Sequence, residues 1–255
     1  MSNKTLILII CAIIVICAGG AGYFYWLQTR PLVVSDDQIK SAQEDSKKAN
    51  QPNLNPPMAS STPKTPEPVT SASGECKRNF DQNKLNTAKV AISGRQVEME
   101  VKGFGKIKLE FYDKDAPKTV ENFLRLVNAG YYDCLTFHRI GKEFMIQGGD
   151  PTGRGSGGES AFGGKFADEL NSNTTSYKTG YVKGVLAMAN AGANTNGSQF
   201  FILVADYPLD HNYTIFGHVV GGQDVADKIS IQATTNGGVG APKTPVVMQS
   251  VKIIK

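Results

Sequence analysis

The chain has 255 residues, of which 40% are hydrophobic and 20% charged, and its formal net charge is +4 at pH 7. This length predicts one or two domains. The positive charge is small and scattered, so electrostatics indicate no nucleic-acid partner. The four cysteines form no C-x-x-C pair, which excludes a zinc ribbon and a disulfide-dense scaffold.

A largely apolar stretch without formal charge runs from residue 5 to residue 27. A helix rises about 1.5 Å per residue, so this stretch is long enough to cross a hydrocarbon core of about 30 Å. We predict that residues 1–30 are a single-pass transmembrane signal-anchor in the lipid bilayer, with the rest of the chain on the extracytoplasmic (periplasmic or equivalent) side. The alternative is a cleaved signal peptide, which usually has a shorter apolar stretch.

Residues 31–90 are rich in proline, serine and asparagine, and seven of the 12 prolines lie between Pro31 and Pro68. Such a segment buries too little apolar area to offset the entropy cost of ordering it. We therefore predict that residues 31–90 form a disordered, extended tether. It would hold the remaining residues, 91–255, away from the bilayer.

Short runs with strand character dominate the rest of the chain. Alternating polar and apolar residues, or short apolar runs between glycine-rich loops, predict strands at Gln96–Val101, Lys106–Phe111, Leu135–Ile140, Phe144–Gln147, Val185–Met188, Gln199–Val204, Ile215–Val220 and Val246–Ile254. Helical spacing predicts helices only at Ala116–Ala129 and Gln223–Ile229. Many short strands and few helices predict an antiparallel barrel or sandwich.

Two further patterns carry no chemistry. The segment 153–158 matches G-x-G-x-x-G, but Gly-Gly-Asp-Pro precedes it and no helix follows to hold a pyrophosphate, so we interpret it as a flexible surface loop and reject nucleotide binding. The three histidines are too few, and wrongly spaced, for a recognisable metal site. We therefore predict no metal.

Two segments are more informative. Residues 137–150 read Phe-His-Arg-Ile-Gly-Lys-Glu-Phe-Met-Ile-Gln-Gly-Gly-Asp, and residues 186–202 contain Met-Ala-Asn-Ala-Gly and Asn-Thr-Asn-Gly-Ser-Gln-Phe-Phe-Ile. Each aromatic residue taken alone indicates only core packing. Together, over residues 96–255, these motifs resemble the cyclophilins, a family of peptidyl-prolyl cis–trans isomerases. The resemblance implies a mainly β fold, a closed eight-stranded antiparallel β-barrel with two capping α-helices.

The resemblance also implies the site. Arg139 would be the catalytic residue, and proline-containing polypeptides would be the substrates. The residues that would bind substrate are Phe144, Met145, Gln147, Ala189, Asn190, Gln199, Phe201, Leu209 and Tyr213. No metal and no other cofactor is required. With the predicted anchor, this suggests an isomerase that assists the folding of exported proteins; the alternative is a proline-recognising binding or holdase module with incidental catalysis.

Two positions depart from a common pattern of the family. Pro208 stands where some members have a tryptophan that contributes to cyclosporin binding, so we expect cyclosporin binding here to be weak. Tyr213 stands where the family has a histidine in the substrate groove, and it keeps an aromatic ring with a polar tip. Neither change removes Arg139, so we still expect activity.

Cys76 and Cys134 leave two alternatives open. If the body is exported, the two cysteines could form a disulfide that pins the segment before the barrel to the loop after the first helix. They could equally be free thiols, because the sequence alone does not supply the geometry of a disulfide.

Overall fold

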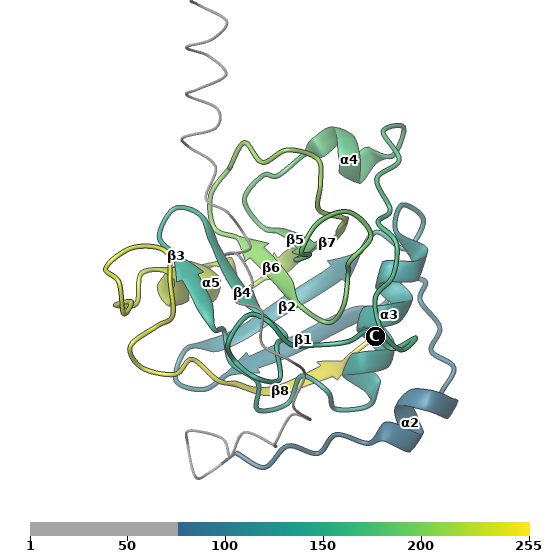
Figure 1. Cartoon of the computed structure of the whole chain (residues 1–255), viewed down its shortest axis with the longest axis horizontal. Coiled ribbons are helices and arrows are strands. Elements are labelled where there is room, and N and C mark those ends of the chain that lie inside the picture. The colour runs from purple at the N-terminus through teal and green to yellow at the C-terminus, as the bar shows by residue number, and fades with distance from the viewer. Residues whose placement is uncertain (1–75) are drawn as a thin grey trace, which may run out of the picture. The chain divides into compact units, whose positions relative to one another are not determined.

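The computed structural model describes residues 76–255 (Figure 1). The predicted anchor at residues 5–27 and most of the predicted tether lie outside the described residues. Among residues 76–255, no helix is both long enough and apolar enough to cross a bilayer.

An eight-stranded antiparallel sheet forms the body of the molecule, as predicted, but it is a curled sheet with edges at β3 and β8 where a closed barrel was expected. Its strands are β1 (Gln96–Val101), β2 (Gly105–Phe111), β3 (Arg139–Gly141), β4 (Met145–Gly148), β5 (Val185–Met188), β6 (Phe200–Leu203), β7 (Ile215–Gly221) and β8 (Met248–Ile253). The spatial order is β3-β4-β6-β5-β7-β2-β1-β8, and the sheet is curled (Figure 1). Isolated bridges, Thr136 with Val247 and Ile140 with Gly240, connect the β3 edge to the segment before β8.

The closure of the curled sheet differs from the predicted strand pattern. The strand expected at Leu135–Ile140 is only Arg139–Gly141. Before it, the chain makes single hydrogen bonds across the closure: the Phe137 amide donates to the Val246 carbonyl oxygen at 2.9 Å. Apolar residues in a sequence indicate a buried segment, whether that segment is a regularly paired strand or makes only isolated hydrogen bonds. The apolar pattern of residues 135–140 therefore does not distinguish the two.

The inner face of the sheet follows from the alternation of its strands. In β1 the residues Val97, Met99 and Val101 are buried, and the residues between them are partly exposed. Met99 lies directly opposite Ile107 of β2, and directly opposite residues of an antiparallel pair point to the same side. The β1–β2 hairpin therefore presents one apolar face to the core.

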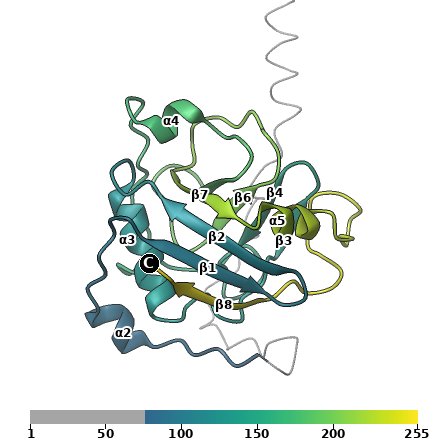
Figure 2. The ribbon, with the colours of Figure 1, turned by 180° about the vertical axis from the view of Figure 1, so that it is seen from behind.

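Two helices, α3 (Pro117–Asn128) and α5 (Gln223–Ser230), lie on opposite sides of the curled sheet (Figures 1 and 2), and both were predicted. α3 begins with Pro117, whose missing N–H would have no partner in the first turn. Its Phe123 ring is fully buried and packs edge-on against the Phe200 ring at 5.4 Å. Two shorter helices, α2 (Gln82–Thr87) and α4 (Thr175–Thr179), were not predicted.

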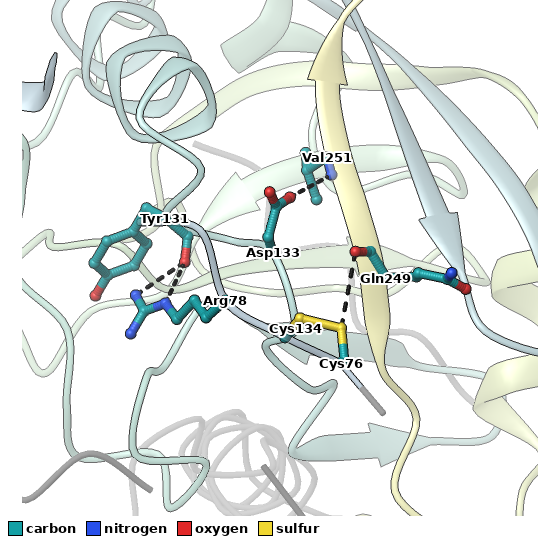
Figure 3. The surroundings of a disulfide bond; sticks show 7 residues. All are labelled: Cys76, Arg78, Tyr131, Asp133, Cys134, Gln249 and Val251. Atoms are coloured by element: carbon teal, nitrogen blue, oxygen red, sulfur yellow. Dashed lines mark hydrogen bonds between the residues drawn. A yellow bond between two sulfur atoms is a disulfide. The ribbon is translucent and has the colours of Figure 1, made fainter. Parts of the chain in front are cut away.

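Residues 76–90, which the sequence analysis assigned to the end of the tether, pack against the body. The Asp81 carboxylate accepts a hydrogen bond from the Lys84 amide at 3.0 Å and caps α2. Leu85 is buried. The Arg78 guanidinium donates to the Tyr131 carbonyl oxygen at 2.9 Å and lies 4.8 Å from the centre of the Tyr131 ring (Figure 3). The sequence of this segment shows no helical or strand period. A helix cap and a few side-chain contacts hold the segment against the body, and such contacts leave no period in the sequence.

A disulfide joins Cys76 to Cys134, so of the two alternatives the structure has the bonded one (Figure 3). Cys134 lies at the closure of the sheet, where its amide donates to the Met248 carbonyl oxygen at 2.8 Å. Beside it, the Asp133 carboxylate accepts from the Val251 amide at 2.9 Å. The disulfide thus fastens the first described residues to the point where β8 meets the chain before β3.

Reduction of this disulfide should destabilise the body. The cysteines are 58 residues apart, and opening a loop of this size costs about 2–4 kcal/mol of unfolding free energy. Urea unfolding of the purified chain with and without reductant measures the difference. Cys76→Ser is the control, because reductant should have no further effect on that variant. If both thiols of the untreated chain react with an alkylating agent, the disulfide is not formed and the prediction is wrong.

Candidate active site

The central feature of the outer face is a row of side chains that crosses four strands. Arg139 of β3 lies opposite Gln147 of β4, Gln147 lies opposite Phe201 of β6, and Phe201 lies opposite Ala187 of β5. Directly opposite residues share a face of the sheet, so these four point outward together. The row beside it points into the main core and is wholly aliphatic: Ile140, Ile146, Ile202 and Leu186.

A second apolar cluster covers this outer face and is separate from the main core. Phe201 and Met145 are fully buried in it, and Phe144 is 2% exposed. It brings together all the apolar residues that the sequence analysis assigned to substrate binding: Phe144, Met145, Ala189, Phe201 and Leu209. The strands between the two clusters are therefore buried on both faces.

The Arg139 side chain lies over this cluster. Its guanidinium carbon is 5.9 Å from the centre of the Phe144 ring, within the range of a cation–π contact. Partial burial lowers the pKa of Arg139, and the nearby Tyr213 opposes that shift. An arginine remains protonated throughout the physiological pH range even so. The structure thus holds a permanent positive charge and its N–H donors beside a buried apolar cluster.

A chain of amide hydrogen bonds orients the guanidinium. The Arg139 Nη1 donates to the Gln147 side-chain oxygen at 3.2 Å. The Gln147 Nε2 donates in turn to the Gln199 side-chain oxygen at 3.0 Å. The three polar residues expected from separate sequence motifs, Arg139, Gln147 and Gln199, therefore form one connected group.

Tyr213 borders the same surface. Its ring packs edge-on against the Phe201 ring, with centres 5.7 Å apart. Burial raises the pKa of Tyr213, although the Arg139 guanidinium acts in the opposite direction. Its hydroxyl group is therefore neutral near pH 7 and offers a polar, uncharged tip beside the guanidinium.

Asn190 is placed differently from the other predicted residues. Its side-chain nitrogen donates to the Asn212 carbonyl oxygen at 2.8 Å, and its side-chain oxygen accepts from the Gly192 amide at 3.2 Å. Asn190 therefore holds the loop that leads into Tyr213. Its neighbour Ala189 donates its amide to the Gln199 carbonyl oxygen at 3.0 Å, which fixes the β5 end against β6.

Two tyrosines that sequence reasoning missed support the site. The Tyr207 ring lies 4.3 Å from the Phe144 ring, centre to centre. The Tyr181 hydroxyl donates to the Tyr213 carbonyl oxygen at 2.8 Å and accepts from the Tyr213 amide at 3.0 Å. Tyr207 precedes Pro208, the position that departs from the family pattern, and that departure was the one available signal. Nothing in the local sequence indicates the contact of Tyr181.

Comparison with known proteins identifies the family. The sequence model described as cyclophilin type peptidyl-prolyl cis-trans isomerase/CLD matches residues 96–253, which span the whole sheet. The chain belongs to this family. It is a peptidyl-prolyl cis–trans isomerase of the cyclophilin type.

Similar cyclophilins occur in distant organisms. The chain is 52% identical over 133 residues to the peptidyl-prolyl cis-trans isomerase CYP18-2 of Arabidopsis thaliana, covering 52% of this chain and 79% of that protein. It is 50% identical over 139 residues to the isomerase ppi1 of Schizosaccharomyces pombe, covering 54% and 86%. The shared part is the isomerase domain, and the N-terminal region of this chain lies outside it.

A solved structure is also similar. The crystal structure of a cyclophilin-type isomerase from Cryptosporidium parvum has 35% sequence identity and a TM-score of 0.57, covering 63% of this chain and 98% of that one. A second crystal structure of that protein, in the presence of the dipeptide Ala-Pro, matches equally well. The cyclophilin fold of this chain is thus supported by sequence and by structure.

His138, next to Arg139, should make this cyclophilin less stable in acid. Burial lowers the pKa of His138, and the nearby Asp150 carboxylate only partly opposes this. The folded state therefore holds neutral His138, while the unfolded chain takes up a proton below about pH 6.5. This contribution to stability is complete above that pH and is lost as the pH falls.

The measurement compares urea unfolding at pH 7.5 and pH 5 for the wild type and for His138→Gln. We expect the unfolding free energy of His138→Gln to fall less between these two pH values. The same variant at pH 7.5 alone is the control for packing, since His138 is neutral there in both states. An equal fall in both proteins would contradict the assignment.

Proposed function

We propose that Arg139 is the catalytic residue of this isomerase and that the outer apolar cluster grips the proline ring of the substrate. The observation that carries the proposal is the placement of one guanidinium, bonded to Gln147, over the Phe144 ring of the outer apolar cluster. The similar isomerase from Cryptosporidium parvum, crystallised with Ala-Pro, supports a proline-containing peptide as the ligand.

The chemistry requires a hydrogen-bond donor and no nucleophile. Rotation about a peptide bond is opposed by a barrier of about 18–20 kcal/mol, because the nitrogen lone pair is delocalised into the carbonyl group. In the half-rotated X–Pro bond the lone pair returns to the nitrogen, which becomes pyramidal and can accept a hydrogen bond. Arg139 would donate to it there. The planar ground-state amide offers no such acceptor, so the interaction favours the transition state.

The remaining residues would bind and orient. The outer cluster with Phe144, Met145, Phe201 and Leu209 would receive the ring and exclude water from the reacting bond. The side-chain amide of Gln147 would fix the guanidinium and hold the substrate backbone on one side of the proline. With one side held, the other side is free to turn, and rotation then proceeds without any covalent intermediate.

Replacement of Arg139 tests this role. Arg139→Ala should reduce kcat/KM by about a hundredfold or more, the usual cost of removing one transition-state donor. Arg139→Lys should restore only part of the rate, because a lysine lacks the forked donor that Gln147 holds. NMR exchange on an X–Pro peptide measures the rate without an auxiliary protease.

Arg95→Ala is the matched control, because within residues 76–255 the Arg95 guanidinium donates to the nearby Ala91 carbonyl oxygen and not to a residue of the candidate site. Equal rates for Arg139→Ala and Arg95→Ala would overturn the catalytic assignment. Peptide binding by Arg139→Ala should persist. If that variant also retains the full effect on a folding substrate, the alternative of a proline-recognising binding module with incidental catalysis is the correct one.

We further propose that the isomerase domain acts on exported polypeptides and is held at a membrane by residues 5–27. The apolar N-terminal sequence supports an anchor. The Cys76–Cys134 disulfide supports an exported domain, because disulfides persist chiefly in oxidising compartments. Uncatalysed X–Pro isomerisation takes tens to hundreds of seconds, so a tethered isomerase would speed the folding of newly exported chains.

Protease added outside intact cells tests the topology. If the domain is exported, the protease should cut the tether and release a fragment that contains the isomerase domain. Cells opened beforehand are the control for cleavage itself. Cleavage only after opening would overturn the proposed orientation, and a mature N-terminus beyond residue 27 would show a cleaved signal peptide in place of the anchor.

A further inference from the structure

The glycine-rich loop that follows β4 is built around a buried carboxylate. Asp150 is 1% exposed. Its Oδ1 accepts hydrogen bonds from the Thr152 amide at 2.8 Å and from the Thr152 hydroxyl at 2.9 Å. Its Oδ2 accepts from the amides of Arg154, Gly155 and Gly157. The carboxylate therefore accepts hydrogen bonds from four backbone amides of the loop.

This arrangement explains the glycine motif that the sequence analysis set aside. Clustered backbone N–H groups are a common binding site for anions such as phosphate. Here the chain's own carboxylate takes up those donors, and the hydrogen bonds hold the pKa of Asp150 below its usual value despite burial. The Asp150 carboxylate thus holds the loop in place, whereas the sequence analysis expected a flexible surface loop.

The carbonyl groups of the same loop bond to a residue of the candidate active site. The Gln199 Nε2 donates to the Gly155 carbonyl oxygen at 3.0 Å and to the Gly157 carbonyl oxygen at 2.9 Å. These two bonds occupy the Gln199 amide nitrogen and so determine which way its oxygen points. That oxygen accepts from Gln147, whose own oxygen accepts from Arg139.

We propose that Asp150 is a positioning residue for isomerisation: through the loop 152–157 and the amides of Gln199 and Gln147, it fixes the direction of the Arg139 guanidinium. This inference rests on the proposed catalytic role of Arg139. Every step is a hydrogen bond with one donor and one acceptor. If one side-chain amide flips, its donor faces a neighbouring donor, or its acceptor faces a neighbouring acceptor. The orientation at one end of this series of hydrogen bonds therefore sets the orientation at the other end.

The packing of the loop gives an independent way to disturb it. A methyl group at Gly157 would collide with the Asp150 carboxylate and would lie 2.7 Å from the Thr152 methyl carbon. The carboxylate or the loop must then move. Gly157→Ala therefore disturbs the same contacts as a change at Asp150 and leaves the charge of the carboxylate intact.

The experiment compares Asp150→Asn and Gly157→Ala with the wild-type full chain, measuring kcat and KM for an X–Pro peptide by NMR exchange. An asparagine cannot accept with its amide nitrogen, so part of the loop loses its acceptor. We expect kcat to fall about tenfold or more in both variants, since small misplacements of a catalytic group are costly. We expect KM to change by less than about twofold.

Two matched controls separate positioning from general damage. Asp133→Asn removes a carboxylate that caps the Val251 amide and has no contact with this loop in the hydrogen bonds of residues 76–255. Gly238→Ala adds a methyl group at a glycine with no atom near enough to collide. Both controls should keep the wild-type kcat. Thermal unfolding of all four variants shows whether each is folded at the assay temperature.

The NMR signal of the Arg139 Nε–H group distinguishes positioning from stabilisation. If Asp150 only stabilised the fold, its replacement would leave this signal unchanged. We expect it to shift or broaden in Asp150→Asn and Gly157→Ala and to be unchanged in the controls. If both variants are folded and keep the wild-type kcat and Arg139 signal, the inference is overturned. If instead Arg139→Ala keeps the wild-type rate, the proposed catalytic role itself fails, and the two failures are distinguishable.

Discussion

The structure depends on strands that are buried on both faces. In β4 and β6, neighbouring residues point alternately into the main core and into the outer cluster, so that Ile146 and Ile202 fill the interior while Gln147 and Phe201 form the site. A shift of register by one residue would exchange the two faces. Because both faces are packed, the core that stabilises the fold also fixes the site to the same backbone.

Placement on strands that are packed on both faces makes the candidate site rigid. The Arg139 guanidinium and the Phe201 ring come from β3 and β6, which are both paired with β4 in one sheet. Arg139 carries its charge at a partly buried position. In the proposed mechanism, a hydrogen bond from there to the reacting nitrogen would be stronger than in water. The same burial makes orientation important, and the amide chain through Gln147 and Gln199 supplies it.

The segment before the family domain is part of the folded structure. Residues 76–90 lie outside the family match at 96–253, yet Leu85 is buried against the core and Cys76 is bonded to Cys134. The disulfide reaches the place where the ends of the sheet meet.

The sequence by itself predicted the eight strands, although β3 is shorter than expected, and the helices α3 and α5, because short alternating runs are local properties of the chain. The resemblance to the cyclophilins, carried by local motifs, implied the apolar members of the candidate site. The sequence did not determine how the sheet closes, that residues 76–90 pack on the body, or that Cys76 and Cys134 are bonded. Those features, like the contacts of Tyr181 and the links from Asp150 to Gln199, join residues far apart in the chain. Only the tertiary structure decided them, since a hydrogen bond between distant residues leaves no period in the sequence.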